Sequence, residues 1–339
     1  MEQIFTSHNK RFSEMAVGVE ASSLLCTSTS MITQAVARPV RHFAKPPGVI
    51  RHTPCCGGIL GYIFQNTSYI VEYIWEEGKN LDHSSIRLDG KKVLITGVSR
   101  PLGIGATLAK RFAEAGASVV IHGFSGYDLT VGCNNSATSN GTENVASQLA
   151  DSGLNVIAVT PSDFTKKGTA EKAIEEATKK LNGLDGLVLN HCYGTLIEMG
   201  DWTEENLDPH FSVNIRACML MIQAFAKQVD TATNNAITLF TSGQYYAPML
   251  NEIPYCVAKE AIVNLCRQSA ALLGKRNIRV NCINPGANDT GYYDGDTSHW
   301  CIPDDAADLV LFLHSRYARH ITGQMIASDK GLSIGGWVL

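Results

Sequence analysis

Short apolar runs alternate with longer segments of helical periodicity from Leu88 to the end of the chain. The short runs have the length of buried strands and predict strands at Lys92–Ile95, Val119–Ile121, Val156–Val159, Gly186–Leu189, Ala236–Phe240, Ile278–Ile283 and Gln324–Ala327. The longer segments predict helices at Ala106–Ala115, Asn144–Ala150, Ala170–Leu181, Leu207–Val229, Ala258–Leu273 and Asp305–Leu313. Because strands that alternate with helices run parallel, the pattern predicts an α/β fold, a doubly wound parallel sheet with helices on both faces.

The first 87 residues lack sustained periodicity, and we expect them to form an irregular extension before a single domain of residues 88–339. The extension begins with many Ser and Thr residues and carries several basic residues before Pro46-Pro47-Gly48. Two interpretations stay open: a poorly structured segment, or an organelle transit peptide within residues 1–45. The first is consistent with a cytoplasmic protein, and the second with import into a mitochondrial or plastid matrix.

Charge and composition favour chemistry on a small molecule. The apolar stretch Ile59–Trp75 is interrupted by Gln65, Asn66 and Glu72, so we expect no membrane span. A formal net charge of -4 offers no basic surface for nucleic acid or for an anionic membrane. The ten cysteines include no Cys-x-x-Cys pair, and we interpret them as reduced thiols rather than metal ligands.

A glycine-rich turn, Thr96–Gly105, separates the first predicted strand from the first predicted helix. Glycines at such a place let the backbone approach a pyrophosphate, and the free amides and dipole of the following helix stabilise its charge. A glycine-rich turn by itself is weak evidence. Its position between a strand and an alanine-rich helix, however, predicts a Rossmann-type dinucleotide site.

The turn resembles the Thr-Gly-x-x-x-Gly-x-Gly segment of the short-chain dehydrogenase/reductase family, with Gly97, Gly103 and Gly105 in the matching positions. Pro101 and Leu102 stand as a two-residue insertion, which predicts a longer loop. The resemblance covers about residues 88–337. It implies cofactor contacts from Gly97, Ser99, Arg100, Gly103, Ile104, Gly105, Asp163, Asn190, Tyr255, Lys259, Pro285, Gly286 and Thr290.

Two of the residues expected to contact the cofactor, Asp163 and Asn190, follow the third and fourth predicted strands. Asp163 matches the family's aspartate at the adenine ring, although a turn cap is an equally good interpretation of the local sequence. Asn190 matches the last asparagine of the family's Asn-Asn-Ala-Gly segment, in which His191 and Cys192 replace the rest. We interpret His191 as packing or as an edge of the cofactor site.

The choice of cofactor depends on the end of the second strand, where NAD enzymes place an acidic residue on the ribose 2'-hydroxyl. Gly123 occupies that position. Arg100 matches the base that related NADP enzymes use for the 2'-phosphate, and a guanidinium suits that dianion. The other interpretation of Arg100 is a solvated loop charge. We therefore expect NADP(H), with NAD(H) as the alternative.

Tyr255 and Lys259 carry the candidate acid–base chemistry, because a spacing of four residues puts both on one face of a helix. A phenol with a pKa near ~10 is a poor base at neutral pH. An ammonium about 5 Å away would lower that pKa to roughly 8 at an effective dielectric constant of ~20. Because Tyr-x-x-x-Lys pairs are common by chance, the surrounding residues decide whether this pair has a function.

The surroundings resemble the family in chain order. Ser242 lies just past a predicted strand, where the family has its substrate-orienting serine. Asn214 matches the helix asparagine that holds a water in the family's proton relay, and Thr290 of the Pro285-Gly286 segment matches the threonine at the nicotinamide carboxamide. A serine at a strand end or an asparagine in a helix is common by itself. Together the matches imply a catalytic set of Asn214, Ser242, Tyr255 and Lys259.

The resemblance implies an NAD(P)(H)-dependent carbonyl reductase or alcohol dehydrogenase of the short-chain type, acting on a small carbonyl or alcohol. Tyr255 would pass a proton to the carbonyl oxygen while Ser242 hydrogen-bonds it. The pattern is most similar to that of 3-oxoacyl-carrier-protein reductases, so we expect a β-keto thioester or a related ketone as substrate. The alternative function is a non-catalytic NADP(H)-binding sensor or structural protein with the same fold.

Two further expectations concern the surface. A short lid after the Pro-Gly segment runs from Gly291 to Pro303. Its aromatic residues either line an apolar opening or only pack against one another: Tyr292, Tyr293, His299 and Trp300. The family resemblance also implies a homodimer or homotetramer that assembles through the long helices.

Overall fold

The computed structural model describes residues 86–130, 140–293 and 295–334. These residues belong to one compact unit, Glu72–Leu339. The expectations for the N-terminal extension, for a targeting segment and for the stretch Ile59–Trp75 fall on residues outside the described part. Within the described ranges, no helix combines the length and the apolar character needed to cross a membrane.

The centre of the fold is a seven-stranded, all-parallel sheet in the order β3-β2-β1-β4-β5-β6-β7. The strands are β1 (Lys92–Thr96), β2 (Ser118–His122), β3 (Val156–Ala158), β4 (Gly186–Leu189), β5 (Asn235–Phe240), β6 (Ile278–Asn284) and β7 (Met325–Ala327). All seven predicted strands are therefore confirmed. The order reverses between β1 and β4, which is where an open parallel sheet forms a ligand crevice at its carboxyl edge.

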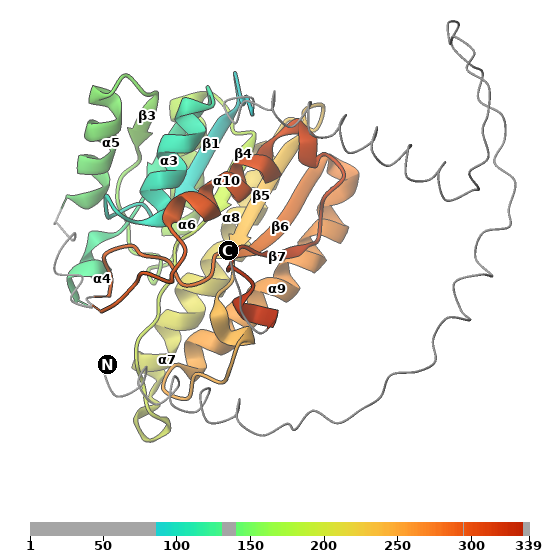
Figure 1. Cartoon of the computed structure of the whole chain (residues 1–339). Coiled ribbons are helices and arrows are strands. Elements are labelled where there is room, and N and C mark those ends of the chain that lie inside the picture. The colour runs from blue at the N-terminus through green and yellow to red at the C-terminus, as the bar shows by residue number, and fades with distance from the viewer. Residues whose placement is uncertain (1–85, 131–139, 294, 335–339) are drawn as a thin grey trace, which may run out of the picture. The chain divides into compact units, whose positions relative to one another are not determined.

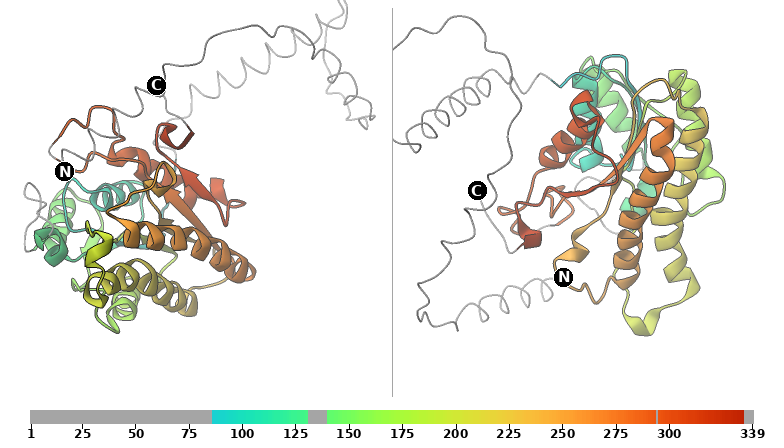
Figure 2. Two further views of the ribbon diagram at one scale, coloured as in Figure 1. Left: turned by 90° about the horizontal axis from the view of Figure 1, so that it is seen from below. Right: turned by 90° about the vertical axis from the view of Figure 1, so that its right-hand side faces the viewer.

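Helices cover both faces of this sheet, as Figures 1 and 2 show. One hydrophobic core lies beneath α3 (Ile104–Glu114), α5 (Gly141–Asp151) and α10 (Pro303–His314). The other lies beneath α6 (Thr169–Leu181), α8 (Cys218–Gln228) and α9 (Ile253–Leu273). Successive strand residues point to opposite faces, so Leu94 belongs to the second core and its neighbour Ile95 to the first. This confirms the doubly wound Rossmann-type fold.

The predicted long helix Leu207–Val229 is divided into three parts, which corrects that prediction. Helix α7 (Glu204–Phe211) contains Pro209, and a π-helical segment (Ser212–Ala217) joins it to α8. Proline has no amide hydrogen and cannot donate in the helical ladder, so the regular pattern is weakened at this point. Short π-helical segments are frequent at functional sites, and this one contains Asn214.

Two other elements differ from the prediction. Helix α9 begins at Ile253, five residues before the predicted start at Ala258, with Pro254 in its first turn, where the missing amide hydrogen costs nothing. Tyr255 and Lys259 consequently lie in the same regular helix. A short helix, α4 (Ser125–Thr130), follows β2 and was not predicted, because six residues that include Gly126 show no helical periodicity.

Candidate active site

A cavity of about 710 Å³ opens at the carboxyl edge of the sheet. This volume lies within the range of small-molecule and cofactor sites. With the exception of Asn214, every site residue expected from the sequence lines it: Gly97, Ser99, Arg100, Gly103, Ile104, Gly105, Asp163, Asn190, Ser242, Tyr255, Lys259, Pro285, Gly286 and Thr290. The fold therefore brings the glycine turn and the Tyr255 helix to one space.

The glycine turn has the close packing that a dinucleotide site requires. Gly97 has φ +75°, and a Cβ there would lie 2.7 Å from the amide nitrogen of His191. A Cβ at Gly105 would collide with the carbonyl oxygen of Gly97. The side chain of Asn190 fixes the same turn, because its Nδ2 donates to the carbonyl oxygens of Thr96 and Gly97 at 3.1 and 3.0 Å.

The inserted pair Pro101-Leu102 leaves this packing intact. The amide of Gly103 donates to the carbonyl oxygen of Arg100 at 3.1 Å, which closes the insertion into a turn with Leu102 exposed. Helix α3 then begins at Ile104 without a side-chain cap. Free amides at an uncapped helix start suit an anion, so this end of the cavity fits a pyrophosphate.

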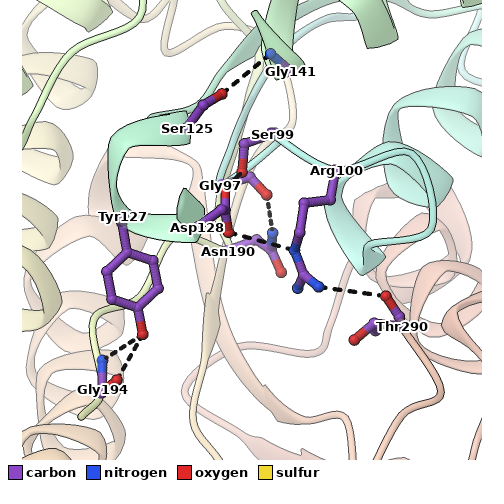
Figure 3. Close-up of polar contacts among 10 residues, drawn as sticks. All are labelled: Gly97, Ser99, Arg100, Ser125, Tyr127, Asp128, Gly141, Asn190, Gly194 and Thr290. Atoms are coloured by element: carbon purple, nitrogen blue, oxygen red, sulfur yellow. Dashed lines mark hydrogen bonds and ion pairs between the residues drawn. The ribbon is translucent and has the colours of Figure 1, made fainter. Parts of the chain in front are cut away.

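Arg100 lies between two sides of the cavity (Figure 3). Its Nε is 3.4 Å from Oδ1 of Asp128 in α4, and its NH1 donates to the carbonyl oxygen of Thr290 at 3.4 Å. Its guanidinium carbon is also 5.8 Å from the ring centroid of Tyr292. Only 18% of the Arg100 side chain is exposed. The interpretation of Arg100 as a solvated loop charge is therefore wrong.

Asp128 is a cavity residue that the sequence did not reveal. Its other carboxylate oxygen accepts a hydrogen bond from Oγ of Ser99 in the glycine turn. Burial raises the pKa of this carboxyl above its usual value, and the Ser99 hydroxyl and the Arg100 charge partly offset that effect. The only local signal was an acidic residue six positions after a strand, which is too weak to single out.

Asp163 forms the turn cap that its local sequence allows, and it does so at the edge of the cavity. It lines the cavity, and its two carboxylate oxygens accept from the amide and the hydroxyl of Thr165 at 2.8 and 2.7 Å. The carboxylate thus forms a turn cap at the edge of the site.

His191 is a buried packing residue at the edge of the cavity, as the sequence suggested. Its Nδ1 is 2.7 Å from Oγ1 of Thr96 and its Nε2 is 3.2 Å from the carbonyl oxygen of Val213. Burial lowers its pKa to about 3, so the ring is neutral at physiological pH.

At the other end of the cavity, Tyr255 stands beside Ser242 and Lys259. Burial raises the pKa of the Tyr255 phenol well above its usual value, and the Ser242 side chain offsets this effect only in part. The buried Nζ of Lys259 is 5.6 Å from the centroid of the Tyr255 ring and donates to the carbonyl oxygen of Phe240 at 3.0 Å. The expected fall of the phenol pKa toward neutrality is therefore wrong for the protein alone, because desolvation disfavours the tyrosinate more than Ser242 favours it.

Asn214 lies behind the cavity wall. Its Oδ1 accepts from the amide of Tyr193 at 2.9 Å, and its Nδ2 donates to the carbonyl oxygen of Tyr193 at 2.8 Å. The residue is buried, and it contacts the loop after β4 instead of the cavity.

That loop contributes further residues that the sequence did not reveal. Cys192, Tyr193 and Thr195 all line the cavity. The phenol of Tyr127 in α4 bonds the backbone of Gly194 in the same loop (Figure 3). Nothing in the sequence pattern indicates a contact between these two segments, because it exists only after β2 and β4 take their places on either side of β1.

Some aromatic residues of the short lid line the cavity and others pack against one another, so both expected roles occur. Tyr292 and Trp300 line the cavity, and Trp300 also stacks on Tyr293 with 5.3 Å between ring centroids. His299 is exposed and does not line the cavity. Across the described part of the chain, no group of three His, Cys, Asp or Glu side chains is arranged to hold a metal ion.

Comparison with known proteins identifies the family. A family model described as "Enoyl-(Acyl carrier protein) reductase" matches residues 97–333. The chain is 29% identical over 263 residues to dehydrogenase/reductase SDR family member 4 of Sus scrofa, which covers 72% of this chain and 88% of the relative. It is 28% identical over 268 residues to glucose 1-dehydrogenase of Gluconobacter oxydans, which covers 74% of this chain and 94% of that enzyme.

Solved structures give the same result. A short-chain dehydrogenase from Burkholderia cenocepacia in complex with NADP is 29% identical with a TM-score of 0.63, and covers 73% of this chain and 99% of its own. A short-chain dehydrogenase/reductase from Serratia marcescens is 27% identical with a TM-score of 0.63 and the same coverage. The chain therefore belongs to the short-chain dehydrogenase/reductase family and is an NAD(P)-dependent oxidoreductase that acts on CH–OH groups.

Proposed function

We propose that this enzyme is a carbonyl reductase that prefers NADP(H) and reduces a 3-oxoacyl thioester or a related ketone. Its catalytic residues are Tyr255, Ser242 and Lys259, and Asn214 supports them from behind the cavity wall. The observation that carries the proposal is the convergence of Ser242, Tyr255 and Lys259 on the cavity that also contains the glycine turn. We assign this chemistry to a catalytic domain of residues 88–339.

The cavity residues fit a dinucleotide along its whole length. The uncapped start of α3 and the glycine turn would hold the pyrophosphate, and the end of β2 with Asp163 would border the adenosine. Pro285, Gly286 and Thr290 would border the nicotinamide, close to Tyr255 and Lys259. A nicotinamide cofactor bound in this way supplies the hydride.

Tyr255 is the proton donor in this proposal. Its raised pKa keeps the phenol protonated at neutral pH, and this is the form that reduction of a carbonyl requires. Ser242, which lines the same cavity, can donate to the same substrate oxygen as that oxygen becomes an alkoxide. The Lys259 ammonium, held by the Phe240 carbonyl, favours the tyrosinate that remains until solvent returns a proton.

The preference for NADP(H) rests on Arg100. Among the described residues that line the cavity, only Arg100 and Lys259 are arginine or lysine. Lys259 lies beside Tyr255, at the proposed catalytic end. Arg100 belongs to the glycine turn and lines the cavity, where a guanidinium suits a 2'-phosphate. The relative from Burkholderia cenocepacia was solved with NADP, which is consistent with this preference.

The substrate proposal rests on the family description and on the lid. The matching family model is named for a reductase of acyl-carrier-protein substrates. Tyr292 and Trp300 give the lid side of the cavity an aromatic lining, which suits an apolar acyl chain. The shared cavity of Ser242, Tyr255 and Lys259 favours an enzyme over the alternative of a non-catalytic sensor.

We also propose a homo-oligomer, a dimer or tetramer. Exposed apolar side chains on α8 and α9, Met219, Val257 and Leu272, would be covered in such an assembly. Light scattering coupled to size-exclusion chromatography measures the mass, and a monomer at micromolar concentration would contradict this proposal.

The function is tested by following oxidation of NADPH and of NADH with a panel of carbonyl compounds. The panel contains an acetoacetyl thioester, simple ketones and a 2-enoyl thioester. In a separate assay, glucose is offered with NADP+ or NAD+, and reduction of the cofactor is followed. We expect the highest kcat/KM with the acetoacetyl thioester and NADPH. Faster turnover of the enoyl thioester or of glucose would replace the proposed substrate, and tight cofactor binding without any turnover would indicate the sensor.

A further inference from the structure

Asp128 is an acidic side chain inside the dinucleotide cavity, and its partners are two residues of the glycine turn. Its carboxylate accepts from the Ser99 hydroxyl and lies 3.4 Å from Nε of Arg100. Only 8% of its side chain is exposed. Figure 3 shows the carboxylate beside the turn, between Ser99 and Arg100. Asp128 is therefore held where a cofactor bound to the turn would meet it.

The usual position for an acidic residue that binds the ribose cannot hold one in this protein. Such a residue stands at the end of the second strand. Gly123 occupies that place, and a Cβ there would collide with the carbonyl oxygen of Val98 and with Oγ1 of Thr142. Any acidic group that meets the ribose would therefore come from another element.

Asp163 is a poor candidate for this role. It is the other acidic residue among the described residues that line the cavity. Both of its carboxylate oxygens already accept hydrogen bonds from Thr165. Asp128 instead contacts Ser99 and Arg100, and it follows the β2 end by only six residues.

We propose that Asp128 determines the cofactor selectivity of this enzyme. Its carboxylate takes the place of the missing acidic residue and accepts a hydrogen bond from the ribose 2'-hydroxyl of NAD(H). It also neutralises Arg100 and repels a 2'-phosphate, and so it limits the preference for NADP(H). This inference rests on the proposed function only for the cofactor class and for the contact between Arg100 and the 2'-phosphate.

Binding of the reduced cofactors tests the proposal without any turnover. Quenching of protein fluorescence gives Kd for NADPH and for NADH, and the measured quantity is the ratio Kd(NADH)/Kd(NADPH). In Asp128→Asn, we expect this ratio to rise about tenfold to a hundredfold, because a unit negative charge is removed within a few ångströms of the 2'-phosphate. Asp128→Ser is a second neutral variant that keeps a polar partner for Ser99.

Two control variants separate charge from structure. Asp128→Glu retains the charge, and its ratio should stay within about threefold of that of the original chain. Asp163→Asn removes the other carboxylate of the cavity and should change both Kd values by similar factors. Near-ultraviolet circular dichroism confirms that each variant has the native fold.

The outcomes distinguish this proposal from the proposed function. A ratio that stays within about twofold in both neutral Asp128 variants overturns the role of Asp128. If Arg100→Gln still weakens NADPH binding selectively in that case, the proposed NADP(H) preference stands. An unaltered chain that binds neither cofactor overturns both proposals.

Discussion

The phenolic oxygen of Tyr127 holds both backbone groups of Gly194: it donates to the carbonyl oxygen at 2.6 Å and accepts from the amide at 3.1 Å. Gly194 lies directly against Tyr255, the proposed proton donor, since a Cβ there would be 2.9 Å from Cδ2 of Tyr255. Tyr127 belongs to α4, which also carries Asp128, the partner of Ser99 and Arg100 in the glycine turn. One short helix therefore contacts both ends of the cavity.

Tyr127→Phe should lower kcat about threefold to tenfold, because two backbone groups behind Tyr255 lose a hydrogen-bond partner worth about 1 kcal/mol each. The Kd for cofactor should change less than kcat. Steady-state kinetics and fluorescence titration measure the two quantities. Tyr317→Phe, at an exposed phenol, is the matched control and should leave both unchanged. An equal effect of the two substitutions on kcat would show that Tyr127 does not position Tyr255.

Tyr255→Phe should reduce turnover by a factor of about 100 or more, the range of a lost general acid. The ring and its packing against Gly194 remain, so cofactor binding should persist. Single-turnover kinetics with saturating cofactor separates the chemical step from binding. If the variant keeps its turnover, the proton donor has been assigned to the wrong residue.

Gly97→Ala should destabilise the protein and weaken cofactor binding. The substitution puts a Cβ at φ +75° and 2.7 Å from the amide nitrogen of His191. Gly153→Ala is the matched control, since Gly153 has φ +81° but no atom within 4 Å of the added Cβ. We expect a loss of about 1 kcal/mol from backbone strain in the control and of roughly 2–4 kcal/mol at Gly97, measured by urea unfolding. Equal losses would mean that close packing at the turn contributes nothing.

Stability should decrease as the pH falls below about 6.5, and His314 should contribute to this decrease. The ring is buried, with Nε2 3.1 Å from Oγ1 of Thr238, and burial lowers its pKa to about 3. The unfolded chain takes up a proton near pH 6.5 while the folded chain does not, so the stability present above that pH is lost toward pH 3.

The slope of this loss can be measured by urea unfolding at pH 7, 6 and 5. Each such histidine contributes up to about 1.4 kcal/mol per pH unit, and His122 and His191 are buried in the same way. His314→Gln should flatten the slope, whereas His320→Gln, at an exposed position, should not. Identical slopes for the two variants would exclude a buried neutral ring at position 314.

Much of the fold could be predicted from local pattern. All seven strands follow from apolar runs, because strands buried on both faces need continuous apolar sequence. The π-helical segment at Asn214 could not be predicted, since a helix with one extra residue per turn has nearly the same hydrophobic pattern as a regular one. Helix α4 was missed because six residues are too few to show a period.

The candidate site could also be predicted from the sequence only in part. Residues that belong to one short motif, such as Gly97 and Gly105 or Tyr255 and Lys259, could be found because a turn or a helix fixes their mutual positions. Ser242 could be found through its position after a strand, and it lines the cavity. The pKa of Tyr255 could not be predicted, because it depends on how much water the completed cavity excludes.

By itself the sequence determined the individual strands and helices, the glycine turn and the spacing of Tyr255 and Lys259, because each depends on residues close to one another in the chain. Only the tertiary structure decided that Asp128 would meet Ser99 and Arg100, that Tyr127 would hold Gly194, and that Asn214 would lie behind the cavity wall. Those contacts join segments far apart in the chain, and strand order, not local sequence, brings them together.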